Sequence, residues 1–216
     1  MKKFIFGFAL LLLNVACGKS QIEDPASVQD SSNVSATESG GIVTAEIKAD
    51  ATEDQRVVAS LSSAVASSSV TFPLGAIRTA TTITLGEGDA GLTDSGLSEL
   101  GVSSAAAATL KSSPLNVGAL TVPSLEKDAD VKLPLPVKAA DLGTGSGAAL
   151  AGKYSVFFLS IVYTSPTTKV VSLKKLGKTN LVGTFAKVSV KGIGWFQILV
   201  LPSATTESEK TSNTKN

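Results

Sequence analysis

The sequence predicts an all-β protein, an antiparallel two-sheet β-sandwich that follows a signal peptide and a flexible tether. Short apolar segments recur along the chain, Gly, Pro and Ser separate them, and Val, Ile, Leu and Thr are plentiful, while aromatics make up 5% of the 216 residues. Short strands with regular turn signals are typical of sandwiches and barrels. Without its polar ends the chain keeps about 150 residues, enough for one domain with a buried core.

Residues 1–16 are expected to form a signal peptide. Residues 1–3 are positively charged, residues 4–13 are apolar, and residues 14–16 resemble a small-residue cleavage region. The apolar run is about half the roughly 20 residues that a membrane-spanning helix needs. A buried helix of the folded domain is the alternative, but the flanking pattern favours export.

Residues 13–17 resemble the lipobox of bacterial lipoproteins, in which a small residue precedes a lipidated cysteine. Val15 and Ala16 match that pattern, whereas Asn14 stands where Leu is usual. The resemblance implies that Cys17 becomes the mature N-terminus and carries acyl chains that anchor the protein in a membrane. Gly18 stands where an Asp would resemble an inner-membrane retention signal, so we expect an outer-membrane anchor in the cell envelope.

The folded domain is expected at residues 42–202, between two polar segments. Residues 17–41 hold the anchor site and a stretch rich in Ser, Asp, Glu, Gln and Asn, which cannot bury enough apolar surface to order itself. This stretch is interpreted as a disordered tether that spans roughly 25–30 Å. Residues 203–216 are similarly polar and are predicted to be a disordered C-terminal tail.

Within the domain, apolar segments and alternating patterns predict strands at Ile42–Ile47, Ser69–Phe72, 81–85, 131–135, 153–164, 169–176, 185–191 and 196–200. Residues 153–164 are apolar on both faces and should form a central strand. Pro134 and Pro136 predict an edge strand for 131–135, because proline has no donor for the strand ladder. Residues 53–66 and 97–110 fit either a strand or a helix.

Residues 70–77, Val-Thr-Phe-Pro-Leu-Gly-Ala-Ile, and the following 81–85 resemble the opening of the ZU-type β-sandwich found in ankyrins, netrin receptors and tight-junction scaffolds. Gly75 and Ala76 match, while Leu74 and Ile77 replace a proline and a leucine of the family pattern. The resemblance covers residues 42–202. It implies a two-sheet sandwich used for protein contacts and supplies no catalytic residues.

Composition excludes several kinds of chemistry. The chain has no histidine and a single cysteine, so it can form no histidine triad, no histidine zinc site, no intrachain disulfide and no cysteine metal cluster. Its formal net charge of +1 argues against a nucleic-acid partner. No cofactor is predicted, apart from the calcium alternative that follows.

Residues 86–91, Gly-Glu-Gly-Asp-Ala-Gly, match the dinucleotide-binding glycine pattern, but Glu87 and Asp89 would repel phosphate and no βαβ unit is visible. The same loop offers Glu87, Asp89 and Asp94 as oxygen ligands for calcium. A solvated acidic loop is the other interpretation, and we prefer it.

The distribution of charge is more informative. No Asp or Glu occurs between Leu142 and Thr206, and Lys169, Lys174, Lys175 and Lys178 fall in this stretch. These four lysines predict a basic patch that could meet anionic glycan or lipid. Outward lysines also guard strands against edge-to-edge aggregation, and we favour that interpretation. Trp195 could stack on a sugar, although core packing is the more usual role.

These observations favour a non-enzymatic, lipid-anchored envelope protein that acts as a structural or protein-interaction module. Its expected partners are the membrane, through Cys17, and an envelope protein or anionic glycan. A lysine-face binder of anionic envelope glycan or lipid is the alternative. A hydrolase is a distant alternative, because no nucleophile and base are visibly paired: Ser172 and Lys175 fit a serine–lysine spacing but point to opposite faces of a strand.

Overall fold

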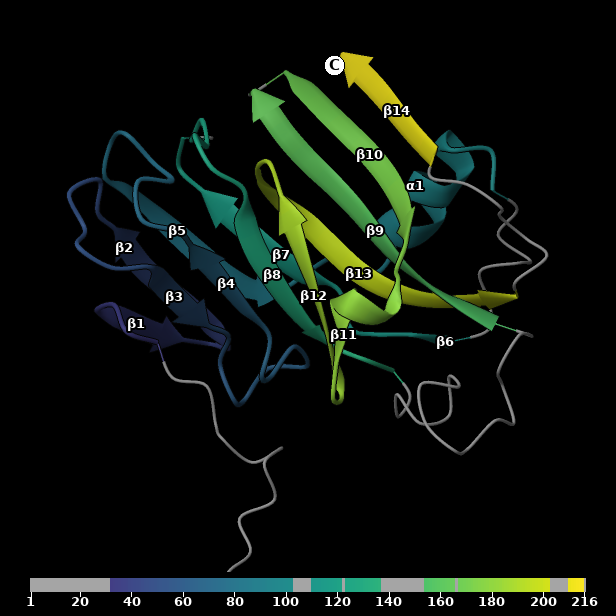
Figure 1. Cartoon of the computed structure of the whole chain (residues 1–216), viewed down its shortest axis with the longest axis horizontal. Helices are drawn as coiled ribbons and strands as arrows, with labels where there is room; N and C mark the ends of the chain where they lie inside the picture. Colours follow the sequence, from purple (N-terminus) through teal and green to yellow (C-terminus); the bar gives the residue numbers. More distant parts are fainter. Residues whose placement is uncertain are drawn as a thin grey trace, which may run out of the picture.

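The computed structural model describes residues 32–102, 110–121, 123–136, 154–165, 167–202 and 210–215. In this part of the chain two antiparallel sheets pack face to face (Figure 1). Sheet A has the strand order β1-β2-β5-β7-β13-β9-β10-β14, with β6 also paired to β13, and sheet B has the order β11-β12-β8-β4-β3. The all-β, two-sheet prediction is therefore confirmed.

The strands of sheet A are β1 Ala36–Ser39, β2 Ile42–Ile47, β5 Thr81–Glu87, β6 Leu110–Lys111, β7 Leu115–Ala119, β9 Tyr154–Ser165, β10 Thr168–Lys175, β13 Ile193–Pro202 and β14 Lys210–Lys215. Those of sheet B are β3 Gln55–Val58, β4 Ser69–Phe72, β8 Ala129–Pro134, β11 Leu181–Val182 and β12 Phe185–Val190. The helix α1 spans Leu92–Glu99, and a 3₁₀ turn, η3, spans Lys178–Asn180.

The first core lies between the two sheets, where alternate residues of each strand point inward. In β8 the side chains of Ala129, Val131 and Leu133 are fully buried, and the residues between them are half-buried. Phe158 of β9 and Phe196 of β13, on neighbouring strands of sheet A, stack within this core with ring centroids 5.7 Å apart. The period of two in the sequence therefore produces the sandwich.

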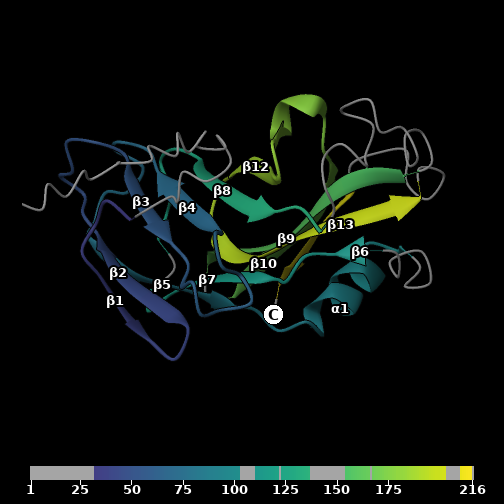
Figure 2. The same cartoon turned by 90° about the horizontal axis from the view of Figure 1, so that it is seen from below.

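A second core lies on the other face of sheet A, under α1 (Figure 2). Phe157, Leu159 and Ile161 of β9 are buried on this face, while Val156, Phe158 and Val162 are buried in the first core. The prediction that residues 153–164 form a central strand is confirmed, because β9 pairs with β10 and β13. The sequence did not reveal that a helix covers its second face.

Hydrogen bonds fix α1 and the loop before it to β13. Thr93 donates to Gln197 Oε1 at 2.7 Å, and Gln197 Nε2 donates to the carbonyl of Ser112 at 2.6 Å. Trp195 Nε1 donates to the carbonyl of Asp89 at 3.0 Å. Trp195 is 1% exposed, so the core-packing interpretation of this residue is confirmed.

The turn after β4 explains how the chain changes sheets. The amide of Ala76 donates to the carbonyl of Pro73 at 2.8 Å, and Gly75 has φ +73°, which favours glycine at the third position of such a turn. Strand β4 belongs to sheet B and the next strand, β5, to sheet A. The motif that carries the ZU-type resemblance is therefore a crossover turn in this protein.

Two domain boundaries and the position of one strand differ from expectation. Strand β1 lies within the supposed tether and pairs with β2, and β14 lies within the supposed tail and pairs with β10. Backbone hydrogen bonds let such polar segments join the edges of a sheet. Strand β8 is central rather than at an edge, since it pairs with both β12 and β4, and Pro134 stands only at its last position.

The two ambiguous segments resolve differently. Residues 55–58 form β3, and residues 97–99 end α1, while 103–109 lie outside the described residues. Among the residues that the structure describes, no helix is both long and apolar enough to cross a membrane.

Candidate functional site

An open groove lies where sheet A extends past the edge of sheet B. The residues that line it come from β9, β10 and β14 of sheet A, which we call its floor, and from β12 of sheet B, which we call its wall. Figure 1 shows β9, β10 and β14 continuing past β12. Its volume is about 350 Å³, at the lower end of the range of ligand sites. The groove is lined by Phe158, Ser160, Val162, Thr164, Val170, Ser172, Lys174, Val188, Ser189, Val190, Lys191 and Thr211.

The alternation of β10 accounts for the mixed character of this floor. Val171 and Leu173 point toward α1 and are fully buried, whereas Val170 and Ser172 point toward the groove and are half-buried. The hydroxyls of Ser172 and Ser160 hydrogen-bond each other at 2.7 Å. The floor is thus partly apolar, and its buried polar groups are satisfied before any ligand arrives.

In the part of the chain that the structure describes, the groove is uncovered because sheet B ends early on this side. After β10 the chain passes through η3 into β11, which pairs with only Phe185 and Ala186 of β12. The side-chain amide of Asn180 then donates to the carbonyl of Lys187 at 3.1 Å. Beyond Lys187, no described strand pairs with this edge of β12.

The predicted basic patch of Lys169, Lys174, Lys175 and Lys178 is divided by the structure. Lys174 lines the groove, and Lys175, the next residue of β10, points to the opposite face of sheet A. Lys169 is paired with Glu99 of α1 at 2.9 Å, and Lys178 is exposed on η3. The four lysines therefore do not form one surface.

A lysine outside the predicted set joins Lys174 instead. Lys191 follows β12 and lines the same groove, and both side chains are exposed. Neither forms an ion pair with another described residue. Strand alternation along β10 could have predicted that Lys174 and Lys175 point to opposite faces of the sheet. The sequence does not show that β12 ends beside β10, so it could not predict that Lys191 lies near Lys174.

The calcium alternative is not supported by the geometry. Glu87, Asp89 and Asp94 belong to no group of three acidic, histidine or cysteine residues that could hold a metal within the described chain. Asp89 Oδ1 instead accepts from the amide of Gly91 at 2.8 Å, and Asp94 lies in the first turn of α1. The helix α1 follows the glycine loop, but the strand before it belongs to an antiparallel sheet, so the loop is not part of a βαβ unit.

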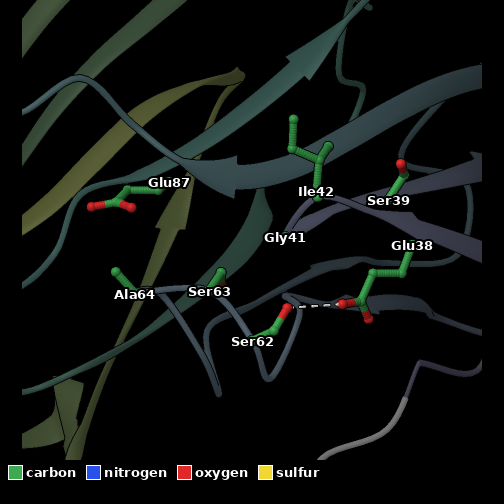
Figure 3. Close-up of a pocket in the computed structure, with 9 residues that line it drawn as sticks. Glu38, Ser39, Gly41, Ile42, Ser62, Ser63, Ala64 and Glu87 are labelled. Carbon is green, nitrogen blue, oxygen red and sulfur yellow. Dashed lines mark hydrogen bonds between the residues drawn. The ribbon is translucent and has the colours of Figure 1, made fainter.

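A second, more acidic pocket lies beside the β1–β2 hairpin (Figure 3). Its volume is about 640 Å³, and Glu38 and Glu87 line opposite sides of it. Ser62 donates to Glu38 Oε1 at 3.1 Å, and Ser60 donates to the same oxygen. Glu38 therefore accepts hydrogen bonds from two serines of the loop that follows β3, and no lysine or arginine is among the described residues that line the pocket.

The outer face of sheet B carries a compact charged cluster. Asp130 accepts from Ser189 Oγ at 2.7 Å and pairs with Lys187 at 2.9 Å. Burial raises the pKa of Asp130, but the hydrogen bonds from Lys187 and Ser189 and the charge of Lys187 lower it by more, so the pKa lies below its usual value. These contacts hold the outward side chains of β12 against β8.

Cys17, residues 1–16 and most of the expected tether lie outside the described residues, as does residue 166 in the β9–β10 turn. The lipid anchor and its outer-membrane location therefore stay predictions.

No family model matches the chain, and the searches of curated proteins and of solved structures each found no match. The likeness to the ZU-type sandwich stays a prediction from the sequence. The functional argument accordingly depends on the geometry of the groove.

Proposed function

We propose that this chain is a lipid-anchored, non-enzymatic protein of a bacterial outer membrane, which acts as a protein-interaction module. The observation that carries this proposal is the open groove over β9, β10 and β14, because sheet B leaves this part of sheet A uncovered. On the other face of sheet A, α1 packs against β9 and β10, and Thr93 joins it to β13 by a buried hydrogen bond. A rigid, half-apolar recess of this kind suits a binding surface.

The N-terminal sequence supplies the location in this proposal. Lipidation of Cys17 would hold the chain at the membrane. The polar residues between Cys17 and β1 would then space the domain roughly 20–25 Å from the bilayer. The ZU-type resemblance adds support, since that module is used for protein contacts.

An anionic glycan or lipid is the second candidate ligand, because Lys174 and Lys191 both line the groove. A hydrolase is the more distant candidate. The acidic pocket beside Glu38 has carboxylates of the right type for glycoside cleavage, but its serine contacts favour a structural role.

The test uses the full chain in cells, with a photoreactive amino acid in place of Thr211 in the groove. We expect one defined protein adduct on irradiation. The control places the same amino acid at Glu46, an exposed position on β2 near the other end of sheet A. Adding Cys17→Ser to the Thr211 chain should release it from the membrane fraction and remove the adduct.

Other outcomes would overturn the proposal. A carbohydrate or lipid adduct at position 211 would favour the second candidate. Equal adducts at positions 46 and 211, or none at 211 while the chain is at the membrane, would remove the groove as a protein-binding surface. Membrane retention of the Cys17→Ser chain would contradict the lipid anchor.

A further inference from the structure

Beyond Lys187, the edge of β12 that faces the groove carries backbone hydrogen-bonding groups that pair with no described strand. The amide of Leu135 donates to the carbonyl of Thr184, so the backbone groups of alternate residues from 184 to 190 face β8. The backbone groups of the intervening residues point away from β8, in agreement with the hydrogen bond from the side-chain amide of Asn180 to the carbonyl of Lys187. Ser189 therefore directs its amide and carbonyl along the edge that no described strand covers.

The space beside this edge lies where a further strand of sheet B would run. Neighbouring strands lie about 4.8 Å apart and packed sheets about 10 Å apart. Sheet A continues beneath the free edge as β9, β10 and β14, so a strand added to β12 would lie over β10. Its inward side chains would cover Val170, which the sandwich leaves half-buried at the groove.

The charges beside the groove indicate the composition of such a strand. Lys174 and Lys191 line it, both without an ion pair to another described residue, and no Asp or Glu is among the described residues that line it. The acidic Asp130 is held on the other face of sheet B by Lys187 and Ser189. Carboxylates on an incoming segment would therefore be attracted, and lysines on it repelled.

We propose that the groove binds an extended, acidic segment of a partner protein as an added strand on β12. This inference rests on the proposed function and names the chemistry of the partner. Backbone hydrogen bonds at Ser189 supply the pairing, apolar side chains meet the floor, and glutamate or aspartate side chains meet Lys174 and Lys191. Strand addition at an exposed edge is an established way for proteins to bind peptides.

The test measures the binding of a fluorescent peptide of about six residues, in which valine and glutamate alternate, to the full chain by fluorescence anisotropy. We expect saturable binding that weakens with added salt. A peptide with lysine in place of glutamate should not bind. Lys174→Glu combined with Lys191→Glu should weaken binding about tenfold or more.

Two matched variants separate strand addition from general attraction. Lys175→Glu with Lys178→Glu makes the same change of charge away from the groove and should leave the dissociation constant within about twofold. Ser189→Pro removes the edge amide without breaking the pairing with β8, and should weaken binding about tenfold or more. Ser189→Ala loses only the hydroxyl bond to Asp130 and should bind like the native chain.

The proposal is overturned if Ser189→Pro binds as well as Ser189→Ala, or if the peptide does not bind. Binding of heparin or of anionic vesicles that depends on Lys174 and Lys191 but not on the Ser189 amide would assign the groove to an anionic glycan or lipid instead. Absence of peptide binding together with a protein adduct at position 211 would refute the acidic strand alone. Absence of both would refute the proposed function as well.

Discussion

Gly88 is confined by the indole ring of Trp195. A Cβ at position 88 would lie 2.6 Å from Trp195 Cδ1 and 2.7 Å from Nε1, closer than atoms can pack. The ring cannot easily move away, because it is 1% exposed and its Nε1 donates to the carbonyl of Asp89. Close packing on a tryptophan therefore explains the glycine at position 88 of this loop without a bound nucleotide.

We predict that Gly88→Ala lowers the free energy of unfolding by about 1–3 kcal/mol, because overpacking displaces a buried ring. Urea unfolding followed by the fluorescence of Trp195 measures the change. The control is Gly177→Ala, where an added Cβ meets nothing within 4 Å and the backbone has an ordinary φ of −87°. Equal transition midpoints for the two variants would show that the loop can relax around the added methyl group.

Single residues of the candidate site could be predicted only in part. The sequence predicted that Lys174 is exposed and that Trp195 packs in the core. Charge and strand alternation suffice for the first prediction, and the size of the side chain for the second. It grouped Lys169 with Lys174, although Lys169 pairs with Glu99, which lies 70 positions earlier in the chain. Contacts between distant segments decide which lysines form ion pairs, and the spacing of residues along the sequence does not show these contacts.

At the scale of secondary structure, α1 depends on a buried polar contact. Thr93 and Gln197 are both 1% exposed, and the hydroxyl of Thr93 donates to Gln197 Oε1 at 2.7 Å. This bond joins the first turn of α1 to β13. Burial makes the contact consequential, since a buried acceptor without a donor is costly.

We predict that Thr93→Val destabilises the protein by about 1–3 kcal/mol, because it keeps the shape of the side chain and leaves Gln197 Oε1 without a donor. Thr93→Ser keeps the hydroxyl and should retain more of the stability, apart from the lost methyl contact. Chemical denaturation gives the free energies, and hydrogen exchange should locate the loss at α1. A Thr93→Val chain as stable as Thr93→Ser would contradict this role.

Some helices and strands could be predicted from the sequence more easily than others. Ile42–Ile47 and Ser69–Phe72 were predicted with the bounds that β2 and β4 have, because apolar residues and turn signals delimit them. Helix α1 was missed, since eight residues give a weak periodic signal. Strand β14 was missed because Lys-Thr-Ser-Asn-Thr-Lys has no apolar face, and its pairing with β10 depends on the backbone.

At the scale of the whole molecule, the groove follows from the unequal extent of the two sheets. Sheet A continues through β9, β10 and β14, whereas sheet B stops at β12 and the short β11. The sequence predicts that there are two sheets, because strands with one apolar face must pair their faces. It does not predict where one sheet extends past the other, since this depends on strand order, and strand order is set by long-range pairing.

Both hydrophobic cores share β9 and β13, so we predict that the domain unfolds in a single transition. Trp195, the only tryptophan, reports on the core under α1, while far-UV circular dichroism reports on all strands. Their denaturation curves should coincide. Val131→Ala truncates a fully buried side chain in the core between the sheets. It should shift the midpoints of both curves equally, although Trp195 lies in the core under α1. A shift of the circular dichroism curve alone would mean that sheet B unfolds independently of sheet A. In that case β12 would not be a preformed edge to which another strand could bind.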